Sequence, residues 1–266
     1  MTDDRTRDWF PPAEASSPLA QNPMKAAQRA MRPPLPKRFY ETAAVEERDG
    51  AHHLLLDGRA ARTPARNPLA VPTRALAEAL AAEWQGQGAE IDPAAMPLTR
   101  IVNSAIDGVA RERAAVIADM AKYAGSDLVC YRAGEPETLV AEQARAWDPV
   151  LAWAREELGA RFVLSEGVMH VAQPEAAVAA VRARLETVGS PLRLAALHVM
   201  TTITGSVLIA LAQAAGVLEA GQAFAAAHVD ERHQESRWGE DEEALRRRAA
   251  REAEFLAAAR VYALAG

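Results

Sequence analysis

The run from Leu194 to Leu218 contains no Asp, Glu, Lys or Arg, and this stretch constrains the fold more than any other part of the chain. Its length would suffice for a membrane helix, which needs roughly 20 apolar residues. Polar side chains interrupt it, however, and each would cost free energy in lipid: His198, Thr201, Thr202, Thr204, Ser206 and Gln213. Two consecutive helices, or one kinked helix, at the centre of a helical domain would give these groups hydrogen-bond partners. The sequence therefore favours a buried helical core over a membrane span.

The composition is that of a globular protein. The chain has 266 residues, half of them apolar and a quarter charged, which argues against long-range disorder and allows one large domain or two smaller ones; we expect two. The formal net charge of −6 gives no overall basic field, so we expect no nucleic-acid partner. Cys130 is the only cysteine, which excludes an intramolecular disulfide, and its apolar neighbours predict a buried, inert thiol.

Residues 1–36 combine charges, prolines and small polar residues. They contain no apolar signal-peptide core, and the acids Asp3, Asp4 and Asp8 are atypical of a mitochondrial transit peptide. We expect a poorly ordered N-terminal arm on a cytoplasmic bacterial protein.

Residues 37–133 are predicted to form an α+β domain with an antiparallel sheet. Two Asp-Gly dipeptides, at 49–50 and 57–58, separate short runs and are strong hairpin signals. The expected strands are 39–47, 52–56 and 59–63, followed by a helix over 74–84 that Thr73 would cap. Helices over 96–124, broken near Asp107-Gly108, and a short strand over 128–131 complete this domain.

Residues 134–266 are predicted to form an all-helical domain. Helical segments are expected over 137–158, over 174–188, over the uncharged run, over 219–238 and over 241–262, with an extended piece near 162–171. Asp148-Pro149 interrupts the first of these, but the break need not end the helix. The fold class is therefore α+β, with a small sheet-and-helix domain first and helices second.

Motifs for common catalytic chemistry are absent from the sequence. There is no GxxxxGK[ST] loop, no GxGxxG after a strand and no GxSxG elbow, so neither nucleotide binding nor serine hydrolysis has support. His228 and His233 are five residues apart, which places them on different faces of a helix, so we expect exposed or capping histidines and no metal site. No cofactor is expected.

One helical stripe carries an unusual set of side chains. Glu231, Gln234 and Trp238 fall at i, i+3 and i+7, so a carboxylate, an amide and a large aromatic share one face. Such a stripe suits a recognition surface, because aromatics flanked by hydrogen-bonding groups are favoured at interface hot spots. The alternative is structural: Trp238 packs under the first domain and Glu231 pairs with an arginine. Gly239 is expected to end this helix, and Glu240 to Glu243 to begin the next.

Several blocks between Lys37 and Ala244 resemble, in order, the assembly chaperones of the mitochondrial and alphaproteobacterial F1-ATPase alpha subunit. The matching residues are Lys37-Arg-Phe-Tyr40, Leu56-Asp-Gly-Arg59, Thr63-Pro64, Glu83-Trp84, Gln87, Met96-Pro-Leu-Thr99, Asn103, Asp107, Asp127-Leu128, Cys130-Tyr131-Arg132, Glu135 to Leu139, Gln143, Trp147-Asp-Pro149, Trp153, Asp230-Glu231, Gln234 and Trp238-Gly239. No single block is chemically diagnostic, but their number and order carry the resemblance.

The resemblance implies a chaperone without catalytic activity, which binds the new alpha subunit before it joins beta. It also implies a functionally important carboxylate, which matches Glu231. We expect Glu231, Gln234 and Trp238, with Asp230 and Asp241, to contact the alpha subunit, and the protein to be a monomer without an integral membrane segment. The competing function is a small-molecule enzyme with an acid/base site built from Asp107, Glu231 and Asp230; a membrane-anchored assembly factor is third.

Overall fold

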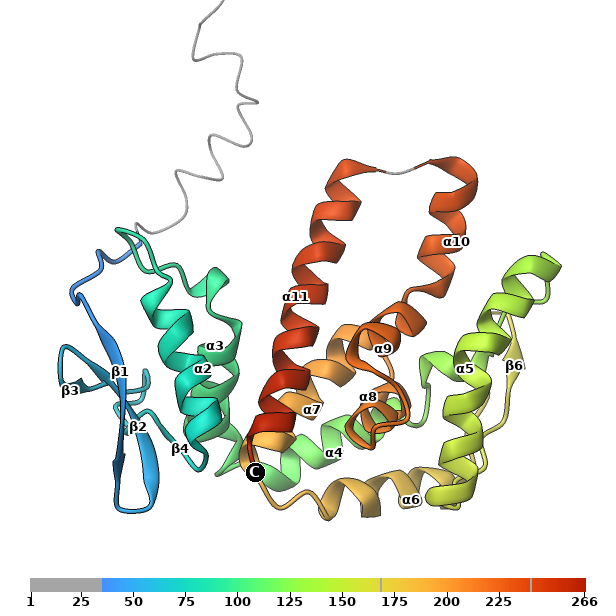
Figure 1. The fold of residues 1–266 in the computed structure, drawn as a ribbon. Coiled ribbons are helices and arrows are strands. Elements are labelled where there is room, and N and C mark those ends of the chain that lie inside the picture. The colour runs from blue at the N-terminus through green and yellow to red at the C-terminus, as the bar shows by residue number, and fades with distance from the viewer. Residues whose placement is uncertain (1–34, 168, 240) are drawn as a thin grey trace, which may run out of the picture. The chain divides into compact units, whose positions relative to one another are not determined.

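The structure, a computed structural model, describes residues 35–167, 169–239 and 241–266 (Figure 1). Most of the arm expected over residues 1–36 therefore lies outside the described residues. The chain from Arg38 to Gly266 forms one compact unit, in which an antiparallel sheet comes first and helices make up the rest. The predicted α+β fold class is confirmed, while the domain boundary between residues 133 and 134 stays a prediction.

The sheet is built around its second strand. The four strands are β1 (Ala43–Arg48), β2 (Ala51–Leu56), β3 (Arg59–Ala60) and β4 (Ala70–Val71). All pairings are antiparallel: β1 takes one edge of β2, and β3 and β4 pair with its two ends. Both predicted Asp-Gly turns are present, with positive φ at both residues of each turn, as two-residue hairpins require. The strands predicted over 39–47 and 59–63 are shorter than expected, and β4 was not predicted.

Helix α2 (Arg74–Gln85) covers the sheet, as predicted. The Thr73 hydroxyl accepts a hydrogen bond from the Leu76 N–H and so caps the helix. Leu76 and Leu80 are buried, and Trp84 packs beside Tyr40 with the ring centroids 5.6 Å apart. Trp84 therefore packs at the junction of helix and sheet, where its indole N–H donates to the Thr99 hydroxyl over 3.1 Å.

The break predicted near Asp107-Gly108 is confirmed as a π-helical turn, η3 (Ala105–Val109), between α3 (Pro97–Ser104) and α4 (Arg113–Tyr123). The strand predicted over 128–131 is wrong. Residues Leu128–Cys130 form a single 3-10 turn, η4, because the Asp127 carboxylate accepts from the Val129 N–H and caps it. Only Tyr131–Arg132 (β5) is extended, and it pairs in parallel with Ser165–Glu166 (β6).

Helix α5 (Glu137–Glu157) runs unbroken through Pro149, so the proline does not end the helix, which the sequence had left open. Proline removes one N–H donor from a helix, but tertiary contacts can outweigh that loss. Here Val150 is fully buried beside the proline, and the indole of Trp147 donates to the Ala226 carbonyl over 2.7 Å. These contacts hold the helix on both sides of Pro149 against the rest of the protein.

The remaining helices are α6 (Glu175–Glu186), α7 (Pro191–Thr204), α8 (Val207–Ala214), α9 (Ala220–Ala227), α10 (Val229–Trp238) and α11 (Glu242–Leu264). The uncharged run divides into α7 and α8 at Gly205, whose φ of 66° suits glycine, and this confirms the predicted pair of helices. Within the described part of the chain, none of the helices has the length and apolarity needed to cross a membrane.

The segment predicted as one helix over 219–238 is two helices, α9 and α10. The chain turns at His228, whose φ and ψ of −121° and 28° are not helical. The buried His228 ring stacks on Phe224, with centroids 4.1 Å apart, and its Nδ1 lies 2.8 Å from the Phe224 carbonyl oxygen. These contacts fix the turn and set the direction in which α10 leaves the helical core (Figure 1).

The core of the helical part is centred on α7, α8 and α11, and Phe255 of α11 is fully buried there. Asp127 joins this core to the preceding segment, because its carboxylate accepts from the Leu208 N–H over 3.1 Å at the start of α8. Burial raises the pKa of the Asp127 carboxyl to about 6, against the lowering effect of the hydrogen bonds that it accepts.

Candidate functional site

Helix α10 has an inner face that is buried and fixed. Val229 and His233 are buried, and the helix packs against α5. The Asp230 carboxylate accepts from the Gln143 side-chain amide over 2.7 Å, and the Gln143 carbonyl in turn accepts from the Ala133 N–H. Because Gln143 is almost completely buried, Asp230 satisfies a polar group that would otherwise lose its partner.

One ion pair and one hydrogen bond fasten α10 to its neighbours. Glu235 pairs with Arg248 of α11, and both side chains are largely buried. On the other side, His233 Nδ1 lies 3.1 Å from a carboxylate oxygen of Glu142 on α5. The helix is therefore held on two sides, and its orientation does not depend on its outer residues.

The outer face of α10 carries the predicted stripe. Glu231 and Gln234 are exposed, and Trp238 leaves 80% of its surface open to solvent. Among the residues that the structure describes, the side chains of these three residues form neither a hydrogen bond nor an ion pair. The structural alternative, in which Trp238 is packed and Glu231 is paired with an arginine, is therefore wrong.

Asp241 has a structural role at the start of α11. Its carboxylate accepts from the Glu243 N–H over 3.0 Å and caps the helix. Glu242 pairs with Arg246 and Glu243 with Arg247 along α11, and α10 ends before Gly239, as expected. Glu240 lies outside the described residues. Of the five predicted contact residues, Asp230 and Asp241 thus form hydrogen bonds that stabilise the fold. The side chains of the three stripe residues form none with the described residues.

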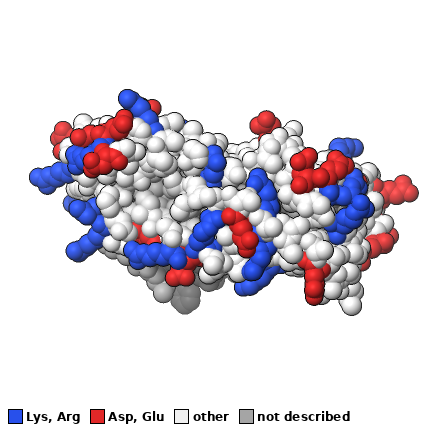
Figure 2. All heavy atoms as spheres, turned by 90° about the horizontal axis from the view of Figure 1, so that it is seen from below, with Lys and Arg blue, Asp and Glu red and all other residues white. Residues whose placement is uncertain are grey.

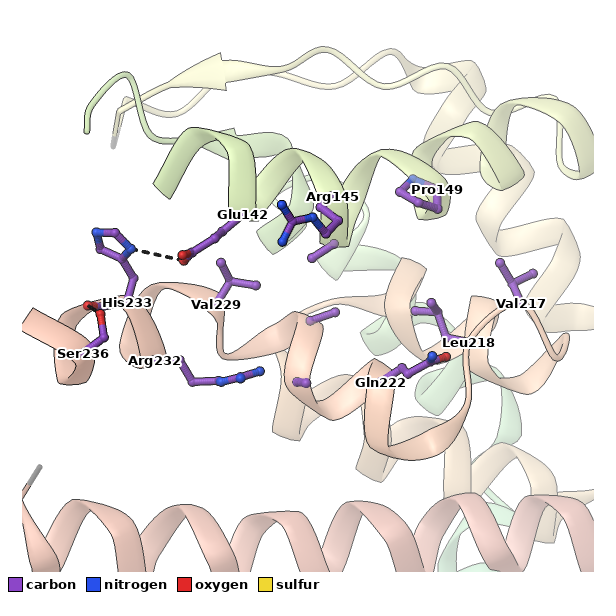
Figure 3. A pocket seen from close by; sticks show the side chains of 13 residues that line it. Glu142, Arg145, Pro149, Val217, Leu218, Gln222, Val229, Arg232, His233 and Ser236 are labelled. Atoms are coloured by element: carbon purple, nitrogen blue, oxygen red, sulfur yellow. Dashed lines mark hydrogen bonds and ion pairs between the residues drawn. The ribbon is translucent and has the colours of Figure 1, made fainter. Parts of the chain in front are cut away.

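A cavity of about 740 Å³ beside this stripe was not predicted (Figure 3). It lies between α5, the loop before α9, α9 and α10. Its lining is Glu142, Arg145, Ala146, Pro149, Val217, Leu218, Gln222, Ala225, Ala226, Val229, Arg232, His233 and Ser236. The α10 residues at 229, 232, 233 and 236 recur at helical spacing, so the sequence could have predicted that they share one face of the helix. The sequence could not have predicted that this face lies against α5.

The residues considered for catalysis are not assembled into a site. The Asp107 carboxylate accepts from Thr63, Asn67 and the Ala65 N–H, and so fixes the turn before β4. Burial opposes its ionisation, but these hydrogen bonds prevail and lower the pKa of the Asp107 carboxyl. Among the described residues, no hydrogen bond joins Asp107 to Asp230, whose carboxylate is engaged by Gln143 instead.

The histidines and the cysteine also have structural environments. Both His228 and His233 are buried, but His228 takes the cap position between α9 and α10, so the expectation of exposed or capping histidines is wrong only for His233. No group of three or more His, Cys, Asp or Glu residues within the described ranges could hold a metal ion. Cys130 is buried as predicted, and burial, with the nearby Asp127 carboxylate, raises the pKa of its thiol to about 12.

Charged side chains of both signs are interspersed on the face of the molecule in Figure 2, which otherwise consists of uncharged residues. This mixed face is in keeping with the modest net charge of −6.

Comparisons with known proteins agree on one family. The family model for the ATP12 chaperone protein matches residues 37–155. Among solved structures, the Agrobacterium tumefaciens Atu1473 protein is 50% identical, with a TM-score of 0.83 over 92% of this chain and 91% of that one. Atp12 from Paracoccus denitrificans is 42% identical, with a TM-score of 0.80 over 87% of this chain and 99% of that one.

A more distant relative extends the match to eukaryotes. The mitochondrial protein atp12 of Schizosaccharomyces pombe is 24% identical over 247 residues, which cover 88% of this chain and 80% of that protein. Together with the bacterial structures, this match confirms the resemblance found in the sequence blocks. The chain therefore belongs to the ATP12 chaperone family of F1-ATPase assembly factors.

Proposed function

We propose that this protein is an ATP-independent assembly chaperone that binds the free F1-ATPase alpha subunit. It covers the alpha surface that later faces beta, and so keeps alpha from aggregating until beta displaces it. The observation that carries this proposal is the outer face of α10, where Trp238 is 80% exposed beside Glu231 and Gln234. An exposed aromatic flanked by hydrogen-bonding groups is the composition of an interface hot spot.

The mechanism is competitive masking. Surfaces that are buried in obligate assemblies are apolar and aggregate when they are left open. A chaperone that covers such a surface without nucleotide hydrolysis must bind more weakly than the natural partner, so that the partner replaces it by mass action. A protein of this kind acts as a monomer in the compartment where alpha is made, which for a bacterial chain is the cytoplasm.

The test is a pull-down of the tagged full-length protein from its native lysate, analysed by mass spectrometry. The Glu231→Lys variant is compared with wild type, and Glu157→Lys is the control, because Glu157 is an exposed residue at the far end of α5. Enrichment of alpha without stoichiometric beta, reduced only by Glu231→Lys, is the expected result. Equal recovery of alpha by Glu231→Lys and wild type would place the site elsewhere, and no recovery of alpha by wild type would refute the function.

A second measurement addresses handover. Purified alpha subunit is diluted from denaturant with and without the protein, in the absence of ATP, and light scattering is recorded. We expect the protein to suppress scattering and added beta to release alpha from it. Suppression that requires ATP would contradict the proposed mechanism.

A further inference from the structure

The cavity beside α10 combines an apolar floor with a basic wall. Ala146, Pro149, Val217, Leu218 and Val229 supply the apolar part, and Val217 is 39% exposed. A volume of about 740 Å³ lies within the range of pockets that bind specific ligands, roughly 300–1,000 Å³. The cavity is therefore large enough to take several side chains of another molecule.

Two arginines line this cavity without forming an ion pair with any described residue. Figure 3 shows Arg145 extending from α5 and Arg232 from α10. Both are exposed, and no carboxylate of the described residues forms an ion pair with either of them. Glu142 is the one acid among the described lining residues, and it is engaged by His233 at 3.1 Å. The lining thus carries two arginines against one carboxylate, in a protein whose net charge is −6.

The cavity and the exposed stripe share one helix. Arg232 follows Glu231 directly, and Val229, His233 and Ser236 line the cavity from the neighbouring side of α10. A polypeptide that covers the outer face of α10 can therefore reach the cavity without leaving the helix.

We propose that this cavity receives a short segment of the client polypeptide, which places an apolar side chain on the floor and an acidic side chain between Arg145 and Arg232. A client peptide offers both groups together, and its carboxylate supplies the ion-pair partner that the two arginines lack among the described residues. This inference rests on the proposed function, since the client is the free alpha subunit.

The test measures the affinity of the full-length protein for purified alpha subunit. The double variant Arg145→Glu/Arg232→Glu reverses the charge of the wall. The control, Arg155→Glu/Arg182→Glu, makes the same change in net charge at two exposed arginines on α5 and α6 outside the cavity. We expect the dissociation constant to rise about tenfold or more in the cavity variant and by less than about twofold in the control.

Each result is decisive. If the cavity variant binds alpha within about twofold of wild type, the inference fails while the proposed function stands. If wild type itself does not bind alpha, the proposed function fails and the inference falls with it. Circular dichroism of both double variants is recorded first, and replacement of Arg145 and Arg232 by Gln serves as the milder variant should reversal disturb folding.

A photo-crosslinking amino acid in place of Val217 identifies the occupant. Crosslinks to an alpha peptide that contains Asp or Glu beside a large apolar residue support the inference. Crosslinks to a second copy of this chain would overturn it. So would crosslinks to the N-terminal residues of the same chain, where Asp8 precedes Trp9 and Phe10. The inference also fails if no crosslink to alpha forms in a mixture where alpha is bound.

Discussion

Replacement of Trp238 by alanine separates binding from folding. Trp238 leaves 80% of its surface exposed, so its packing adds little to the free energy of unfolding. A tryptophan offers roughly 250 Å². Complete coverage of its open part would therefore remove about 200 Å² from water, which corresponds to about 5 kcal/mol at ~25 cal/mol per Å².

Incomplete coverage and the ordering of the side chain reduce that value. We expect Trp238→Ala to weaken binding of the alpha subunit by ~2–3 kcal/mol, or about 30- to 150-fold in Kd, which is the range of an interface hot spot. The free energy of unfolding should change by less than about 0.5 kcal/mol, as for other exposed substitutions.

The assay pairs isothermal titration calorimetry against purified alpha with urea unfolding of the same preparations. Phe39→Ala is the control, because Phe39 is also an exposed aromatic, at 71%, but precedes β1. Its Kd should stay within about twofold of wild type. The reasoning would be refuted if Trp238→Ala bound alpha as tightly as wild type, or if it lost binding only together with stability.

Three further predictions concern stability and reactivity. Burial raises the Asp127 pKa to about 6 from an ordinary 3.8, so its contribution to stability is present at low pH and is lost as pH rises through about 6. Wild type should therefore lose ~1 kcal/mol relative to Asp127→Asn between about pH 5 and about pH 7, measured by urea unfolding; a difference that stays constant would contradict this. Glu83 accepts from two backbone N–H groups and the Thr99 hydroxyl at the start of α3, so Glu83→Ala should lower the free energy of unfolding by ~2–4 kcal/mol, against less than about 0.5 kcal/mol for the exposed Glu78→Ala. Cys130 should react with Ellman's reagent only in denaturant, and rapid labelling of the folded protein would show that its environment opens.

The parts of the fold that could be predicted are those fixed by neighbouring residues. The Asp-Gly turns and the Thr73 cap each depend on one or two residues and their immediate neighbours, and each is present. Other parts depend on distant residues. Pro149 stays inside a helix because Trp147 bonds to the Ala226 carbonyl on α9, a contact that no local pattern reveals.

The same distinction applies to the site. The spacing of Glu231, Gln234 and Trp238 predicted a shared face, and the structure places them on one exposed helix. The spacing alone could not show that this face is open to solvent, because exposure depends on where α5 and α11 lie. The cavity was missed for the same reason, since Arg145 and Arg232 come together only when α5 packs against α10.

Some side chains of α10 stabilise the helix and others are exposed without a bond to the described residues, and this difference decides which substitutions can test the proposed function. Asp230 satisfies the buried Gln143, and Glu235 pairs with Arg248, so replacing either acid disturbs the helix as well as any contact with a client. Loss of binding in such a variant would have two explanations. Glu231 and Trp238 have no described side-chain hydrogen bond or ion pair within the chain. If replacing either residue weakens binding at unchanged stability, the explanation is therefore that the outer face of α10 touches the client.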